Sequence, residues 1–181
     1  ELGELDTAQQ LGERTVTHKQ RIAEWLWDES RGIFANRMIS GEFVSTLAPT
    51  SFFPMAAGIG SKDQSQRMIH GYLNNPSKFG GEFGLPSVTR DDPAYNDNVY
   101  WRGRIWAPLN FWVWQGLKRQ GFIKESEQLA EQSWELFEKN WKQRLCGENF
   151  NAETGEVLDQ PDTDGFYSWG ALLAAMKALE N

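Results

Sequence analysis

The sequence of 181 residues predicts an all-α fold, about half of a two-layer helical toroid. Apolar residues recur at helical spacing in six separate stretches, and no stretch resembles a βαβ unit. These stretches alternate between amphipathic and more uniformly apolar patterns. An outer ring of helices facing water and an inner ring covered on both sides require this alternation. Because such a toroid has twelve helices when complete, six helices make about half of it.

Composition indicates a globular chain and excludes several classes of partner. Hydrophobic residues make up 40% of the chain and charged residues 24%, which is ordinary for a folded domain. The net charge of −7 argues against nucleic acid and against an anionic membrane surface as partners. No uncharged apolar run approaches the roughly 20 residues of a membrane span.

The few cysteines and histidines restrict the chemistry further. Cys146 is the single cysteine, so the chain has no internal disulfide, and we expect a reducing, cytoplasmic location. His18 and His70 have no ligand spacing, so we expect neither a metal nor a cofactor. The chain begins at Glu1 without a signal-peptide pattern, directly before a helix-like stretch, and we expect upstream residues to be missing.

The first half of the chain contains three predicted helices. The first, at 5–27, is amphipathic, and we expect its apolar face to pack with His18 as a packing histidine. A turn at 28–32 and a hairpin that pairs residues 33–34 with 42–44 follow. A short apolar helix at 50–58 comes next. The third helix, at 61–73, begins with a capping box, and its inward side chains are Met68, Ile69, Tyr72 and Leu73.

The second half contains the stretch around which we expect the chain to be organised, Tyr100 to Gly121. A long loop at 74–99 leads into it, and such a loop in a compact domain is usually functional. We predict a buried helix at 103–120 with Trp112 and Trp114 in the core, ended by Gly121. An amphipathic helix at 123–143, a loop at 145–165 and an apolar helix at 166–180 complete the chain.

Three loops precede the more apolar helices, at 28–49, 74–102 and 145–165, and in a toroid they would open on one face. That face would gather Tyr100, Trp101 and Arg102 with several carboxylates. Indole rings stack on the C–H faces of sugars, while carboxylates and arginine bind hydroxyl groups, so we predict a sugar site. Glu148 precedes Asn149 and Phe150, and either a partly desolvated catalytic acid or an ordinary solvated loop acid fits this context.

Four segments together resemble glycoside hydrolase family 63, specifically the C-terminal half of its catalytic domain. The family includes processing α-glucosidases and bacterial mannosylglycerate and glucosylglycerate hydrolases, and the trehalases of family 37 are more distant relatives. The resemblance covers residues 28–180. The segments are YWRGRIWAPLNFWVWQGLKRQG, SVTRDDPAY, GENFNAETGE and PDTDGFYSWGALLAAM.

The resemblance implies an (α/α)6 barrel and an inverting enzyme that hydrolyses an α-linked glucoside or mannoside. It identifies Glu148, in the segment ENFN, as the general base. The remaining implied site residues are Tyr100, Trp101, Arg102 and Gly103 as pocket wall, Trp106, Phe166 and Trp169 as lining or support, and Asp92 as a structural or substrate-contacting acid. The sequence departs from the family at Arg104 and Ala107, where relatives often have proline.

The family's general acid is an aspartate in a motif that this chain lacks. We therefore expect the chain to need the N-terminal half of its barrel as a partner, and to be close to inactive without it. A non-catalytic carbohydrate-binding or structural α/α-toroid domain is the alternative. A third hypothesis, an isoprenoid-handling barrel, needs an acid-rich motif at the cavity centre that the sequence does not supply.

Overall fold

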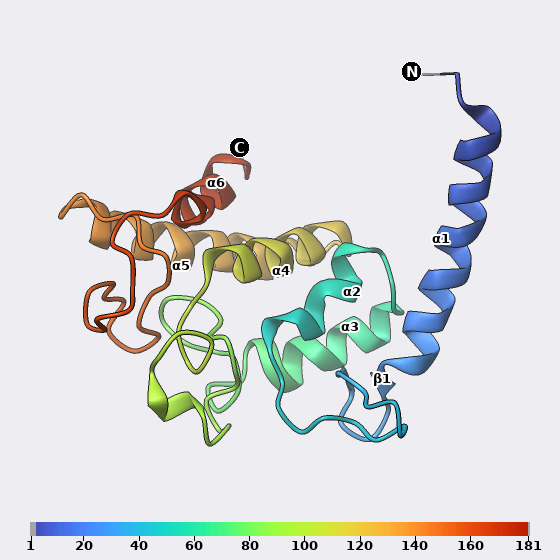
Figure 1. Ribbon diagram of the computed structural model, residues 1–181, viewed down its shortest axis with the longest axis horizontal. Coiled ribbons are helices and arrows are strands. Elements are labelled where there is room, and N and C mark those ends of the chain that lie inside the picture. Colours follow the sequence, from blue (N-terminus) through green and yellow to red (C-terminus); the bar gives the residue numbers. More distant parts are fainter. Residues whose placement is uncertain (1–2, 181) are drawn as a thin grey trace.

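The computed structural model describes residues 3–180, which form helices joined by long loops (Figure 1). Short 3-10 turns at Pro49–Phe52, Tyr95–Asp97 and Ser168–Ala171 lie between them. The six α-helices are α1 (Leu5–Trp25), α2 (Phe53–Ala56), α3 (Lys62–Met68, continued by a π turn at Ile69–Leu73), α4 (Ala107–Arg119), α5 (Ile123–Trp141) and α6 (Leu172–Ala178). In this part of the chain, none of the helices has both the length and the apolar composition of a membrane span.

Helix α1 forms as predicted but does not pack as predicted. None of its residues is buried, and it projects away from the other helices in Figure 1. Only Ile22 and Ala23, near its C-terminal end, pack against the core. His18 is exposed and is therefore not a packing histidine. An amphipathic pattern identifies the face that a helix can bury, but burial also requires a partner surface.

Residues 33–34 form a hairpin with a different segment from the one predicted. Strand β2 (Ile33–Phe34) pairs antiparallel with β1 (Trp27–Asp28) and not with residues 42–44. Asp28 closes the intervening turn by accepting hydrogen bonds from the backbone N–H groups of Ser30 and Arg31 at 2.9 and 3.1 Å. This tight turn folds the chain back on itself, so residues 33–34 pair with the segment just before the turn. The Ser40–Gly41 turn does form, as a smaller bridge between Arg37 and Phe43.

The capping box at the start of α3 is confirmed. The Ser61 hydroxyl accepts from the Gln64 N–H at 3.1 Å, and the Gln64 side chain accepts from the Ser61 N–H at 2.8 Å. Two otherwise unpaired backbone donors are thereby satisfied, which fixes the first residue of the helix. The side chains predicted to face inward, Met68, Ile69, Tyr72 and Leu73, are all buried.

Helix α4 is the centre of the structure, in contact with α2, α5 and α6. It begins four residues later than predicted, because Ile105 is held extended by bridges to Pro86 and Phe150. Trp114 is buried as predicted, but the prediction for Trp112 is wrong, since 51% of its surface is exposed. The helices around α4 leave Trp112 half-exposed, with its ring 6.4 Å from the ring of Phe53 in α2.

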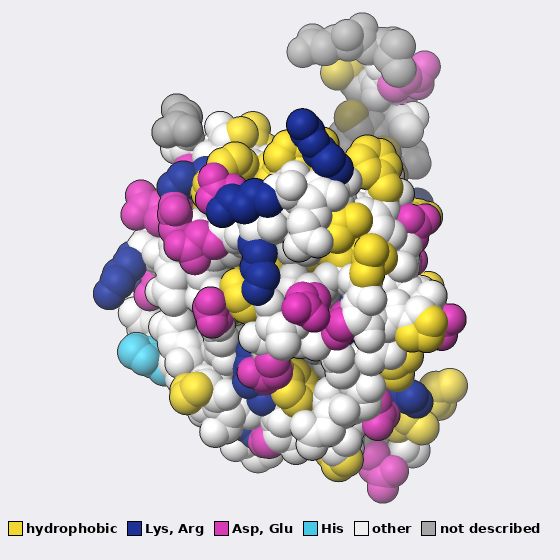
Figure 2. All heavy atoms as spheres, turned by 90° about the vertical axis from the view of Figure 1, so that its left-hand side faces the viewer, with side chains coloured by type: hydrophobic (Ala, Val, Ile, Leu, Met, Phe, Trp, Pro, Cys, Tyr) yellow, Lys and Arg dark blue, Asp and Glu magenta, His cyan; other side chains and the backbone are white. Residues whose placement is uncertain are grey.

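Helices α5 and α6 complete the packing around α4. Helix α5 buries Leu129, Ala130 and Leu136 and turns its charged side outward. Helix α6 begins at Leu172 instead of 166, because Phe166 forms a backbone bridge with Cys146 and the residues Ser168–Ala171 form a 3-10 turn. Figure 2 shows the side of the molecule that lies at the left in Figure 1. Acidic, basic and hydrophobic side chains are mixed over this face.

Candidate active site

Five aromatic side chains from two segments form a single cluster. The rings of Trp101 and Trp106 are stacked, with centroids 3.7 Å apart and planes 12° apart. Tyr100 contacts Trp106 edge-on at 5.0 Å. Trp169 lies 5.8 Å from Trp106, and Tyr167 lies 4.2 Å from Trp169. Trp106 is fully buried and Trp101 is 45% exposed, so a buried indole supports one that is open to a ligand.

A strained turn presents the exposed members of this cluster. Val99 and Arg102 exchange two backbone hydrogen bonds, which leaves Tyr100 and Trp101 at the tip. Tyr100 has φ 48°, a left-handed conformation that costs a tyrosine on the order of 1–3 kcal/mol. The indole N–H of Trp106 donates to the Tyr100 carbonyl at 2.9 Å and holds this conformation. Such strain is frequent where a protein preorganises a ligand site.

Gly103 follows the turn and lies close to the backbone of Tyr95. It has φ 97°, and a Cβ there would lie 2.1 Å from the carbonyl oxygen of Tyr95. Only glycine fits so close to another backbone. Its N–H donates to the Ser87 hydroxyl at 3.1 Å. This close approach explains why the position is glycine, and the role of Gly103 as pocket wall stays a prediction.

Glu148 lies next to the aromatic cluster, in a loop fixed on both sides. Phe150 exchanges two backbone hydrogen bonds with Ile105, at 2.7 and 3.0 Å. Cys146 bonds to the backbone of Gly165 and Tyr167. The N–H of Glu148 donates to the Asp164 carbonyl at 2.9 Å, and the Trp169 indole N–H donates to the Glu148 carbonyl at 2.8 Å. Glu148 is half-buried, which fits a partly desolvated side chain better than an ordinary solvated loop acid.

A buried arginine bonded to Asn149, the residue after Glu148, was not predicted as a site residue. Arg104 is fully buried and forms a 2.9 Å ion pair with Asp159. Burial alone would raise the pKa of Asp159, but this pair and hydrogen bonds from Asn151 and Asn98 outweigh it and lower the pKa. Arg104 also donates to the side chain of Asn149. The only sequence signal was its departure from the family pattern.

The other predicted residues lie in different environments. Arg102 is 59% exposed and pairs with Asp97 at 3.1 Å, so its guanidinium can exchange that partner for a ligand oxygen. Phe166 is 67% exposed, beside the bridge to Cys146. Asp92 accepts from the Ala94 N–H at 2.9 Å and thereby stabilises a turn in its own loop. Of the two roles predicted for Asp92, structural or substrate-contacting, this hydrogen bond fits the structural one.

The predicted convergence of three loops is wrong for loop 28–49. That loop packs on α3, where Arg67 forms an ion pair with Glu29 at 2.7 Å and the Tyr72 hydroxyl donates to the Arg31 carbonyl at 2.8 Å. In Figure 1 it lies on the side of α1, away from loop 145–165. Loops 74–102 and 145–165 build the site. Loop 28–49 does not, because the tight β1–β2 turn directs it toward α3.

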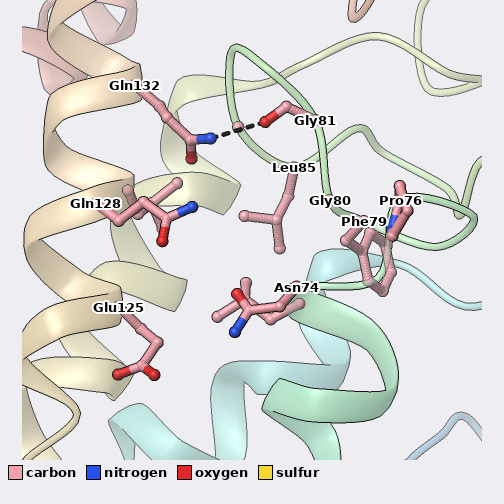
Figure 3. A pocket seen from close by; sticks show the side chains of 12 residues that line it. Asn74, Pro76, Phe79, Gly80, Gly81, Leu85, Glu125, Gln128 and Gln132 are labelled. Carbon is pink, nitrogen blue, oxygen red and sulfur yellow. Dashed lines mark hydrogen bonds between the residues drawn. The ribbon is translucent and has the colours of Figure 1, made fainter.

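A well-formed hollow lies elsewhere, between α5 and the loop after α3 (Figure 3). Its volume is about 460 Å³, and Gln132 crosses its upper end to donate to the Gly81 carbonyl at 2.7 Å. Glu125 and Gln128 of α5 face Asn74 and Leu85 across it. None of the predicted sugar-site residues is among those that line it. The aromatic cluster and Glu148 are therefore the better candidate, because they combine a carboxylate with an exposed indole.

Comparison with known families decides the assignment. The model of the mannosylglycerate hydrolase MGH1-like glycoside hydrolase domain matches residues 1–170. The chain belongs to this family. The resemblance to family 63 is thereby confirmed, and the matched segment is part of the domain.

Individual MGH1-like relatives and solved structures agree with this membership. Mannosylglycerate hydrolase MGH1 of Selaginella moellendorffii is 28% identical over 128 residues, which cover 68% of this chain and 25% of that protein. The crystal structure of the family 63 mannosylglycerate hydrolase from Thermus thermophilus in complex with glucose has a TM-score of 0.70 at 25% identity. The match covers 86% of this chain and 37% of the hydrolase.

A more distant structure shows the same fold. Neutral trehalase Nth1 from Saccharomyces cerevisiae has a TM-score of 0.70 at 19% identity, over 94% of this chain and 30% of the trehalase. These neighbours are (α/α)6 barrels, so the predicted fold class is confirmed. The chain spans about a quarter to two fifths of the lengths of these three proteins.

Proposed function

We propose that this MGH1-like chain contributes the general base and part of the sugar pocket of an inverting glycosidase. The observation that carries the proposal is the position of Glu148. Its backbone is held by Asp164 and Trp169, and Trp169 belongs to the aromatic cluster whose outer member, Trp101, is exposed. A half-buried glutamate whose backbone is bonded to a member of this cluster can act on a sugar that stacks on the exposed indole.

In this proposal Glu148 accepts a proton from a water molecule, which attacks the anomeric carbon from the face opposite the leaving oxygen. A general acid supplied by the rest of the barrel protonates that oxygen. The two carboxyl groups of an inverting enzyme are about 6.5–9.5 Å apart, which leaves room for the water. Trp101 supports the sugar, and Arg102 releases Asp97 to bind a hydroxyl or an anionic oxygen of the substrate.

An α-linked mannoside or glucoside is the proposed substrate class. Support comes from the relatives, whose names include mannosylglycerate hydrolases and trehalases. Glycerate is an anion, and an exposed arginine at the edge of the site suits an anionic aglycone. Mannosylglycerate and trehalose are therefore the two substrates to compare.

The test replaces Glu148 with glutamine in an enzyme in which this chain is joined to the rest of its barrel. Loss of a positioned base should lower kcat by about 10²–10⁴, while KM changes little, because glutamine keeps the shape of the side chain. Glu156→Gln is the matched control, since Glu156 is an exposed carboxylate in the same loop. We expect the control to keep wild-type kcat.

Two results would contradict this assignment. A Glu148→Gln enzyme with wild-type turnover would exclude Glu148 as the base. Proton NMR of the first sugar released should show the β-anomer from an α-linked substrate, and initial release of the α-anomer would exclude inversion. A complete barrel that binds sugar without hydrolysing it would instead favour the non-catalytic binding domain.

We also propose that the rest of the barrel covers the open side of α4, where Trp112 is 51% exposed. This chain expressed by itself should then show no turnover above background. Adding the remaining part of the barrel in trans should restore activity and reduce the exposure of Trp112. Tryptophan fluorescence quenching by acrylamide measures that exposure, and Trp112→Phe identifies its contribution.

A further inference from the structure

Arg104 donates to Asn149, the residue that follows the proposed base, and has no part in the sugar pocket described above. We propose that Arg104 is a positioning residue that orients the base through Asn149. Arg104 fixes the side-chain amide of Asn149, and that amide directs an N–H at the carboxylate of Glu148. This inference rests on the proposed function, in which Glu148 is the base.

Burial makes Arg104 a fixed point. The side chain is fully buried, and its guanidinium is surrounded by acceptors from three parts of the chain. It donates to the side chain of Asn98 at 3.2 Å and to the carbonyls of Glu156 and Val157 at 3.2 and 3.1 Å. A guanidinium held in this way cannot rotate without breaking several hydrogen bonds, and it keeps its charge at any accessible pH.

The orientation of the Asn149 amide follows from the chemistry of arginine. The Nε of Arg104 donates to Asn149, and an arginine has no acceptor, so the amide must turn its oxygen to it. The Thr163 hydroxyl donates a hydrogen bond to the same Oδ1 atom of Asn149 at 3.3 Å. Asn149 is fully buried, so its NH₂ group has one remaining direction, toward Glu148, where Nδ2 and Oε2 are 3.5 Å apart.

The consequence for the base is a defined rotamer. An N–H directed at one carboxylate oxygen fixes the orientation of the Glu148 side chain and leaves the other oxygen to accept the proton of water. The 3.5 Å separation is long for a hydrogen bond. Catalytic hydrogen bonds often tighten only in the substrate complex, so the contact is expected to shorten when a sugar excludes water.

The first test is Asn149→Asp in the complete enzyme. Aspartate keeps an oxygen for Arg104 and Thr163 but replaces the N–H donor with a second carboxylate beside Glu148. The acidic limb of the kcat/KM profile should then move upward by about one pH unit or more, because a like charge disfavours ionisation. We expect kcat at pH 7 to fall about tenfold or more, with KM within about twofold.

The second test compares the single variants Arg104→Gln and Asn149→Ala with the double variant that carries both changes. If Arg104 acts through Asn149, removing both should lower kcat no more than removing Asn149 alone. Arg90→Gln is the matched control, because Arg90 also joins the loop to another segment, by an ion pair with Glu153 and a bond to the Ala152 carbonyl. We expect the control to lower the melting temperature and to keep the wild-type pH profile.

The outcomes separate this inference from the proposed function. A fully active Glu148→Gln enzyme would overturn both. An inactive Glu148→Gln enzyme together with a wild-type pH profile in Asn149→Asp would overturn this inference alone, as would full additivity in the double variant. Arg104→Gln leaves Asp159 without its cation, and if it does not fold, the Asn149→Asp profile by itself decides.

Discussion

Loops 28–49 and 145–165 are similar in length and different in structure. Both contain many polar residues, and both precede a short apolar helix. Loop 145–165 is fixed to segment 98–106 by the Ile105–Phe150 bridge and by a fully buried arginine. Loop 28–49 is held to α3 partly by the Arg67–Glu29 pair, in which the glutamate is 76% exposed.

The difference shows what makes a polar loop into a binding site. Loop 28–49 is closed by its own turn residues, where Asp28 accepts hydrogen bonds from Ser30 and Arg31, and its distant contacts with α3 include exposed pairs such as Arg67–Glu29. Loop 145–165 depends on Arg104, which lies some 40 residues earlier in the chain. Long-range hydrogen bonds to a buried charge hold side chains more rigidly than exposed pairs do, and a catalytic carboxylate requires such rigidity.

The largest effect expected from this comparison is that of removing the centre of the aromatic cluster. Trp106→Ala should lower the free energy of unfolding by about 3–5 kcal/mol, because the side chain is fully buried. Trp25→Ala, beside loop 28–49, is the matched change. Trp25 is 49% exposed and packs on the Arg37 guanidinium, so the loss should be about 1 kcal/mol. Equal losses in urea denaturation would contradict the proposed difference in rigidity.

A smaller effect is expected from adding one methyl group to a glycine in each region. Gly103 and Gly41 both have positive φ, at 97° and 94°. A Cβ at Gly41 meets no atom within 4 Å, so Gly41→Ala should cost about 1 kcal/mol of conformational strain.

At Gly103 the Cβ would also lie 2.1 Å from the Tyr95 oxygen, which forces the backbone to move. Gly103→Ala should therefore cost about 3 kcal/mol or more and should also displace Trp101. Thermal melts measure the cost, and near-ultraviolet circular dichroism measures the aromatic environment. An unchanged aromatic spectrum in Gly103→Ala would show that the turn does not set the position of Trp101.

The smallest effect concerns the acid dependence of loop 28–49. Burial would raise the pKa of Asp28, but hydrogen bonds from Ser30 and Arg31 outweigh it and lower the pKa to about 2. A lowered folded-state pKa contributes stability above the unfolded value of 3.8, and that stability is lost as the pH falls from about 4 to about 2. In Asp28→Asn the melting temperature should be lower at pH 7 and should fall less between pH 4 and pH 2. Parallel curves for the two proteins would contradict this.

Much of the fold was predictable because it depends on local patterns. The capping box at Ser61, the helix stop at Gly121 and the burial of Trp114 each depend on residues within a few turns. The prediction for Trp112 was wrong for a different reason. Periodicity showed that α4 is apolar all round, but the side left open by α2, α5 and α6 is a property of the neighbours.

The sequence by itself determined the helical class, the order of the helices and the aromatic-carboxylate segments that carry family membership. These follow from side-chain chemistry at short spacing, which an unfolded chain already contains. Only the tertiary structure decided that Arg104 bonds to Asn149 next to Glu148, that loop 28–49 leaves the site and that α1 remains exposed. Each depends on contacts between segments far apart in the chain, and the free energy of such a contact exists only when both partners are brought together and shielded from water.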